Sequence, residues 1–161
     1  MLITLLRHAS AEDRSVTLAD EKRILTEKGI KQSKRVASFC QSRQLLPETL
    51  LSSPLLRAEQ TAQIVQSNLT TCPKVTTVNW LENGTPVKVV IAELGKLAEQ
   101  HLDNIWLVGH EPDFSELIAY LLQSKGDHFS IKKASITCLD VCFTETPTAR
   151  LLWSIPCSLI T

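Results

Sequence analysis

The sequence predicts a single α/β domain of three layers, with a largely parallel central sheet, helices on both faces and a C-terminal antiparallel hairpin. Short apolar runs alternate along the chain with helix-like stretches, which is typical of a parallel sheet connected by helices. The 161 residues suffice for one domain with a real core. No repeat, low-complexity tract or Gly/Ser linker divides the chain, so we expect one domain over residues 1–161.

Apolar and β-branched runs predict six strands, near residues 2–6, 48–52, 75–79, 105–109, 134–143 and 149–155. The last two runs are separated by Thr144-Glu145-Thr146-Pro147-Thr148. This short polar connection predicts that they form the antiparallel hairpin at one side of the sheet.

Capping residues predict where three helices begin. We expect helices from the cap Thr26 to about Gln44, from Ser53-Pro54 to about Leu69, and from Thr85-Pro86 to about His101. The polar segment from Ser10 to Asp20 has no periodic pattern and predicts a loop over or beside a site, whereas Asn83-Gly84-Thr85 and Lys125-Gly126-Asp127 predict turns.

Charge and cysteine content exclude several classes of partner. The chain has 17 Lys and Arg against 17 Asp and Glu, so no global field indicates binding to nucleic acid or to a membrane surface. The N-terminal apolar run stops at Arg7 without preceding basic residues, which fits neither a signal peptide nor a membrane span. Five cysteines without a C-x-x-C pair predict reduced thiols. We therefore expect a cytoplasmic protein.

Cationic and imidazole side chains follow three of the predicted strands. Arg7 and His8 follow the first strand, Arg57 lies at the start of the helix after the second, and His110 follows the run 105–109. In open α/β sheets the reactive groups gather outside the carboxyl ends of the strands. Two arginines and two histidines can therefore converge on one anion, such as phosphate or sulfate.

Four segments carry a resemblance to a known family: Arg7-His8-Ala9, Arg23-x-Leu25-Thr26-x-x-Gly29, Ser52-Ser53-Pro54-x-x-Arg57-Ala58-Glu59-Gln60-Thr61-Ala62 and Val108-Gly109-His110-Glu111-Pro112. In this order they resemble the histidine phosphatase (phosphoglycerate mutase-like) superfamily, and within it the short SixA-type phosphohistidine phosphatases. The resemblance runs from Leu2 to about Phe114 and implies the same central sheet flanked by helices.

The resemblance implies a role for each of the converging residues. His8 would be the nucleophile, with one ring nitrogen attacking phosphorus and the other held by a backbone carbonyl. Arg7 and Arg57 would hold phosphoryl oxygens as charge-assisted donors. His110 would be a further donor, most useful when protonated in the transition state. Arg23 either lines the groove that binds the phosphorylated partner or is a solvated charge ahead of a helix.

Two carboxylates are candidates for the general acid. Glu82 lies after the third predicted strand, where it would belong to the substrate-binding groove, and Glu111 directly follows His110. Glu111 is equally explained as a first-turn carboxylate on a helix dipole. An alkoxide leaving group depends strongly on a proton donor, whereas a phosphohistidine leaving group depends on it less. An uncommitted acid therefore favours an N-phosphorylated substrate.

The leading hypothesis is a signalling enzyme, a phosphohistidine phosphatase that dephosphorylates a histidine phosphotransfer (HPt-like) protein through a phosphohistidine intermediate. The short chain leaves little room for insertions that enclose a small substrate, so we expect an open groove. The alternatives are a small-molecule phosphate ester phosphatase of the same superfamily and a non-catalytic phosphate-binding module. The chain has no G-x-G-x-x-G and no metal-ligand cluster, so we expect neither a cofactor nor a metal.

Overall fold

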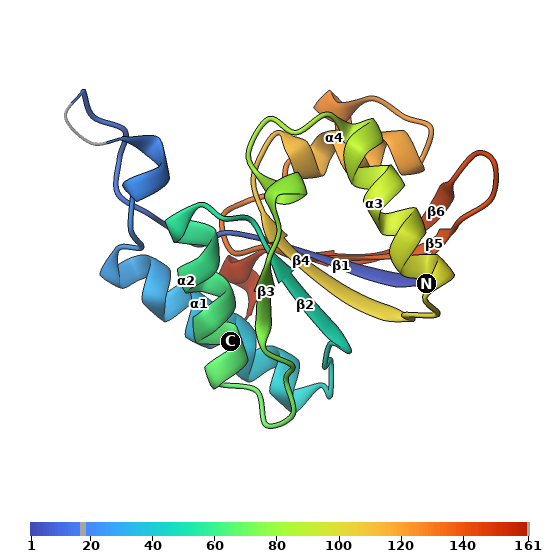
Figure 1. Cartoon of the computed structure of the whole chain (residues 1–161). Coiled ribbons are helices and arrows are strands. Elements are labelled where there is room, and N and C mark those ends of the chain that lie inside the picture. The colour runs from blue at the N-terminus through green and yellow to red at the C-terminus, as the bar shows by residue number, and fades with distance from the viewer. Residues whose placement is uncertain (17–18, 161) are drawn as a thin grey trace.

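A six-stranded sheet forms the middle of the computed structural model, which describes residues 1–16 and 19–160 (Figure 1). The strand order is β3-β2-β4-β1-β5-β6. The strands are β1 Leu2–Arg7, β2 Thr49–Ser52, β3 Val75–Thr77, β4 Asn104–Gly109, β5 Ile136–Cys142 and β6 Thr148–Ile155. Neighbours among β3, β2, β4 and β1 pair in parallel, whereas β5 is antiparallel to both β1 and β6. The predicted parallel sheet with a C-terminal hairpin is confirmed.

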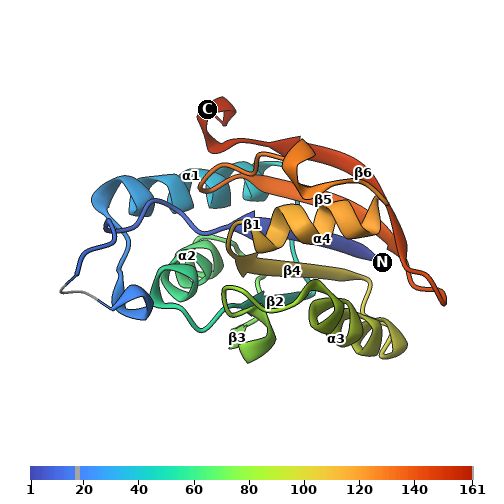
Figure 2. The same cartoon turned by 90° about the horizontal axis from the view of Figure 1, so that it is seen from above.

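Two helices cover each face of the sheet, as Figures 1 and 2 show. Helices α1 (Glu27–Ser42) and α2 (Leu56–Ser67) pack on one face, and α3 (Val87–Glu99) and α4 (Asp113–Leu121) pack on the other. Neighbouring residues of β1 supply both cores, because successive strand side chains point to opposite faces: Leu6 belongs to the first core and Leu5 to the second. Both side chains are fully buried.

Helix α1 begins where the sequence predicts, because Thr26 caps it. The Thr26 hydroxyl accepts from the Gly29 amide at 3.2 Å and donates to the Ser10 carbonyl at 3.1 Å. A Cβ on Gly29 would lie 2.0 Å from the Ser10 carbonyl oxygen, so only glycine lets the helix approach this closely. The motif at Leu25 to Gly29 therefore fixes α1 against the segment that follows β1.

The other two predicted caps are wrong. Helix α2 begins at Leu56 with Leu55 in the cap position, and α3 begins at Val87 with Pro86 in the cap position. Neither helix has a side-chain cap, because Leu55 and Pro86 carry no polar side chain that could accept from the first amides of the helix.

Two further findings concern the whole described chain. Within residues 1–16 and 19–160, no helix is long and apolar enough to cross a membrane. All five cysteines are free, and burial raises the pKa of the Cys40 thiol to about 12. The free cysteines agree with the prediction of reduced thiols.

Candidate active site

Three adjacent strands place their exits side by side. Leu6 of β1 is in register with Val108 of β4, and Val108 is in register with Ser52 of β2. Just beyond the strands, the His8 amide donates to the Gly109 carbonyl at 2.9 Å, which extends the β1 and β4 pairing. The sheet thus brings the residues after β1, β4 and β2 to one edge.

An anion pocket of about 180 Å³ lies at this edge, and we use that name for it below. Its lining comprises Arg7, His8, Arg14, Arg23, Arg57, Asn83, His110, Glu111 and Lys133. Five of these side chains are cationic and one is a carboxylate, so the pocket attracts anions. The four residues that the sequence expects to converge do so, together with Arg23 and Glu111. Glu82 is exposed and lines a different, small cavity beside α3 and α4.

His8 is held as a neutral imidazole of defined tautomer. Its Nδ1 lies 2.8 Å from the Ala9 carbonyl oxygen, which can only accept, so Nδ1 carries the proton. Burial lowers the pKa of His8 to about 3, and the charges of Arg57 and Arg7 add to this lowering. At neutral pH, Nε2 therefore carries a free electron pair in a pocket for anions.

His110 is also neutral, and a serine contacts its ring. Its Nε2 lies 2.7 Å from the Ser53 hydroxyl oxygen, which also accepts from the Leu55 amide at 3.3 Å. The Nδ1 atom is buried and has no hydrogen-bond partner among the described residues. Burial and the neighbouring His8 lower the pKa of His110 to about 3. In the resting protein His110 is therefore uncharged.

Arg7 and Arg57 each have a buried Nε atom without a hydrogen-bond partner in the described part of the chain. One terminal nitrogen of Arg7 donates to the Ile131 carbonyl at 2.6 Å, and both terminal nitrogens of Arg57 donate to Asp20. Burial lowers the pKa of both guanidinium groups, whereas Glu111 near Arg7 and Asp20 near Arg57 raise it. Buried donors without partners are costly unless a ligand satisfies them. These two Nε donors, and Nδ1 of His110 in the tautomer that protonates it, are available to an anion.

Helix α2 supports the loop that carries His8. The Thr61 hydroxyl donates to the Arg57 carbonyl at 2.7 Å and accepts from the Ala9 amide at 3.1 Å. One turn of helix thus joins the residue after His8 to the backbone of Arg57.

Six residues of the site escape the sequence interpretation, namely Thr61, Ser53, Arg14, Asp20, Asn83 and Lys133. Thr61 lies four residues after Arg57 within the quoted motif, and this helical spacing is a signal that could have identified it. The sequence predicts Ser53 as a helix cap. Arg14, Asn83 and Lys133 lie in loops and Asp20 begins a short 3-10 helix, and only the fold brings these four to the site.

Arg23 is buried in the wall of the anion pocket, with 8% of its surface exposed. Its Nε donates to the Glu12 carbonyl at 2.6 Å, and a terminal nitrogen donates to Asp20 at 2.7 Å. The alternative of a solvated charge ahead of the helix is therefore wrong.

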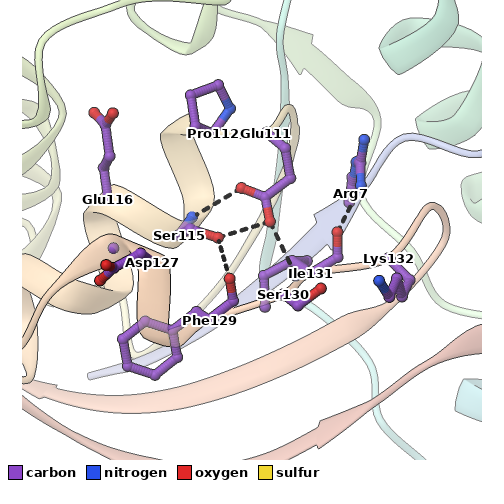
Figure 3. Close-up of a pocket in the computed structure, with 11 residues that line it drawn as sticks. Arg7, Glu111, Pro112, Ser115, Glu116, Asp127, Phe129, Ser130, Ile131 and Lys132 are labelled. Carbon is purple, nitrogen blue, oxygen red and sulfur yellow. Dashed lines mark hydrogen bonds between the residues drawn. The ribbon is translucent and has the colours of Figure 1, made fainter.

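The Glu111 carboxylate accepts three hydrogen bonds (Figure 3). Its Oε1 accepts from the Ser115 hydroxyl at 2.7 Å and the Ile131 amide at 3.0 Å, and its Oε2 accepts from the Ser115 amide at 3.2 Å. The Ser115 amide belongs to the first turn of α4, so Glu111 does satisfy a free donor at this helix end. Glu111 and Arg7 also border a neighbouring cavity of about 430 Å³ that the figure shows.

Within residues 1–16 and 19–160, no group of three or more His, Cys, Asp or Glu side chains is arranged to hold a metal ion. The positive charge of the anion pocket comes from its arginines and one lysine.

Comparisons of sequence connect this site with known proteins. Residues 3–83 match the histidine phosphatase superfamily (branch 1). An uncharacterized protein of Picosynechococcus sp. is 36% identical over 138 residues, which cover 84% of this chain and 82% of that protein.

Comparisons of structure give the same fold. The protein histidine phosphatase SixA complexed with tungstate matches over 100% of both chains with a TM-score of 0.88 and 24% identity. The putative phosphohistidine phosphatase SixA from Agrobacterium tumefaciens matches over 96% of this chain and 97% of its own, with a TM-score of 0.78 and 22% identity. Phosphoserine phosphatase from Entamoeba histolytica in complex with 3-phosphoglyceric acid matches over 95% of both chains, with a TM-score of 0.71 and 19% identity.

Proposed function

The chain belongs to the histidine phosphatase superfamily (branch 1), and from this membership we propose that it is a phosphohistidine phosphatase. In this proposal its substrate is a histidine phosphotransfer protein in cytoplasmic signalling. One observation carries the proposal: His8 has a free Nε2 in a pocket whose buried arginine and histidine nitrogens lack partners in the described chain.

The first step transfers the phosphoryl group to the enzyme. The electron pair of His8 Nε2 attacks phosphorus in line while the bond between phosphorus and the substrate imidazole breaks. The substrate nitrogen keeps that electron pair and leaves as neutral imidazole, because its distal nitrogen already carries a proton. His8 becomes a phosphorylated imidazolium, and the Ala9 carbonyl that accepts from Nδ1 stabilises the new positive charge.

The second step releases phosphate. Water attacks phosphorus, the bond to Nε2 breaks and returns its electron pair to His8, and both protons of the water stay with the product, which leaves as dihydrogen phosphate. In both steps, N–H groups of Arg7, Arg57 and His110 stabilise the equatorial oxygens, where negative charge is concentrated. The donors are held before substrate arrives, so little reorganisation is required in the transition state.

The state of the two candidate acids supports an N-phosphorylated substrate. Three hydrogen bonds hold the Glu111 carboxylate in place, and its Oε1 is engaged as an acceptor by both the Ser115 hydroxyl and the Ile131 amide. Glu82 lies outside the anion pocket. A substrate whose leaving group needs no delivered proton fits this site better than an alkyl phosphate.

The neighbouring cavity supports a substrate that is larger than phosphate. Its 430 Å³ adjoin the anion pocket through Arg7 and Glu111, which border both. The rest of the lining comes from the start of α4 and from residues 126–132, among them Phe129 and Ser130. A histidine presented on a protein surface would place its phosphoryl group in the anion pocket and its neighbouring residues over this cavity.

The proposal is tested by turnover of a phosphohistidine phosphotransfer domain beside an alkyl phosphate ester. We expect the wild type to dephosphorylate the domain much faster than the ester, and His8→Ala to do neither. His128→Ala is the matched control, because this exposed histidine lies outside the anion pocket. Equal turnover of both substrates would favour the ester phosphatase. Phosphate binding without turnover of either substrate would favour the non-catalytic module.

A further inference from the structure

Asp20 binds three of the arginines that line the anion pocket. Its Oδ2 accepts from Arg57 at 2.8 Å, and its Oδ1 accepts from Arg23 at 2.7 Å and from Arg14 at 3.3 Å. Its backbone carbonyl accepts from a second nitrogen of Arg57 at 2.7 Å. Asp20 itself is absent from the lining of the pocket, so it contacts the arginines from outside.

The contact with Arg57 differs from the other two because it engages two nitrogens of one buried guanidinium. Both terminal nitrogens of Arg57 donate to Asp20, while Nε stays without a partner in the described chain. Arg57 is only 3% exposed, so its orientation depends on these contacts rather than on solvent. An arginine fixed through two nitrogens presents its remaining N–H groups in one defined direction.

Asp20 is a carboxylate throughout the range in which the protein would work. Burial raises its pKa, but hydrogen bonds from Arg23 and Arg57 outweigh this effect and lower the pKa to about 2. The negative charge is therefore permanent, and it lies beside a guanidinium that the mechanism uses.

We propose that Asp20 is a positioning residue for phosphoryl transfer, which holds Arg57 in the orientation that binds the transition state; this rests on the proposed role of Arg57 in the phosphoryl clamp. Asp20 touches neither the substrate nor His8 in this proposal. It acts through Arg57, and the 3-10 helix Asp20–Lys22 is the element that supplies it.

Positioning and charge have opposite effects on anion binding, and this makes the proposal specific. Removing the Asp20 charge makes the surroundings of the pocket more positive, which strengthens the binding of a ground-state anion such as inorganic phosphate. Loss of orientation weakens the binding of the transition state, because catalytic donors that are misplaced by about 1 Å can lower the rate about a hundredfold. The variant Asp20→Asn should therefore separate the two properties.

The experiment measures binding of inorganic phosphate and of vanadate by calorimetry, together with kcat on phosphoramidate. Vanadate adopts the five-coordinate geometry of phosphoryl transfer, so it reports on the transition state even if turnover is absent. For Asp20→Asn we expect phosphate to bind as in the wild type or more tightly, vanadate to lose about tenfold relative to phosphate, and kcat to fall by a similar factor. Glu21→Gln, an exposed neighbour on the same short helix, should change none of these.

The Arg57→Ala background shows whether Asp20 acts through Arg57. There, Asp20→Asn should have little further effect on vanadate binding, because the group that it positions is gone. An unchanged ratio of vanadate to phosphate affinity in Asp20→Asn would overturn the proposal. A higher kcat would also overturn it, because it would show that Asp20 competes with the phosphoryl group for Arg57. Failure of the wild type to turn over phosphoramidate would count against the proposed function, whereas the vanadate ratio would still decide the role of Asp20.

Discussion

The imidazole rings of His8 and His110 lie with their centroids 5.2 Å apart and tilted at 52°. Burial lowers the pKa of both rings, and His8 lowers the pKa of His110 further. The pair is therefore uncharged at rest, and a bound phosphoryl group is the negative partner that would favour a proton on His110. The expectation that His110 is protonated in the transition state stays a prediction.

This pair makes folding stability depend on pH in a defined direction. Both pKa values fall from 6.5 in the unfolded chain to about 3 in the folded protein. Between these two pH values the unfolded chain therefore binds more protons than the folded protein does. The free energy of unfolding should fall between about pH 6.5 and pH 3, and a shift of this size is worth on the order of 5 kcal/mol for each histidine. Urea unfolding at stepped pH measures it. His8→Gln and His110→Gln should flatten the dependence, and equal slopes in wild type and variants would contradict this assignment.

Phosphate should be trapped on His8. Brief exposure to labelled phosphorylated substrate followed by rapid denaturation should leave an acid-labile, base-stable label on the peptide that contains His8, because the P–N bond has this stability. Peptide mapping by mass spectrometry locates it. A label on serine or cysteine would refute the nucleophile, and His128→Ala should label as the wild type does.

Arg7 and Arg57 should each be essential for the rate of phosphoryl transfer. Arg7→Ala or Arg57→Ala should lower kcat/KM roughly a hundredfold or more, which corresponds to about 3 kcal/mol of transition-state stabilisation. Lys88→Ala removes an exposed cation of α3 that lines neither the anion pocket nor the neighbouring cavity, and it serves as the control for charge alone. A loss of less than threefold in both arginine variants would mean that the clamp is misassigned.

Activity should not depend on a divalent metal, because the positive charge of the pocket is supplied by side chains. Turnover is measured before and after extensive treatment with EDTA and dialysis. We expect equal rates. Loss of activity that a divalent cation restores would show that an ion belongs to the site.

Substrate choice should separate the two candidate acids. Glu111→Gln should affect phosphohistidine turnover little and alkyl ester turnover more, since only the alkoxide depends on a delivered proton. Glu82→Gln should change neither, because Glu82 lies outside the anion pocket. Phosphate affinity and thermal unfolding identify any variant that has lost its fold. Loss of phosphohistidine cleavage in a folded Glu111→Gln would reveal a dedicated acid and favour the ester phosphatase.

The sequence was sufficient to predict the strands and the convergence on one anion because both follow from short-range patterns. Apolar runs predicted the parallel sheet, and Arg7, His8 and His110 stand within a residue or two of strand ends. Arg57 was predictable for a similar reason, since it lies in the first turn of α2.

Residues that act through long-range contacts could not be predicted from such short-range patterns. Ser53 looked like a helix cap, but its hydroxyl engages His110, 57 positions later in the chain. Asp20 is 37 positions from Arg57, and nothing in the polar segment around it distinguishes it from its acidic neighbours. Lys133 reaches the pocket from the loop before β5. Only the folded arrangement relates these residues to the site.

The segment after His8 is closed at its base, which makes its length adjustable in protein engineering. The Glu12 amide donates to the Ile24 carbonyl at 2.9 Å, Ala11 pairs with Leu25, and the Thr26 amide donates to the Ser10 carbonyl at 3.0 Å. These contacts fix the entry and exit of the chain independently of what connects Glu12 to Asp20. Lengthening a surface loop costs little free energy when its ends are already held together. The length of this segment could therefore be changed while the geometry around His8 is preserved, provided that Arg14, which lines the anion pocket, and Asp20, which binds Arg57, are retained.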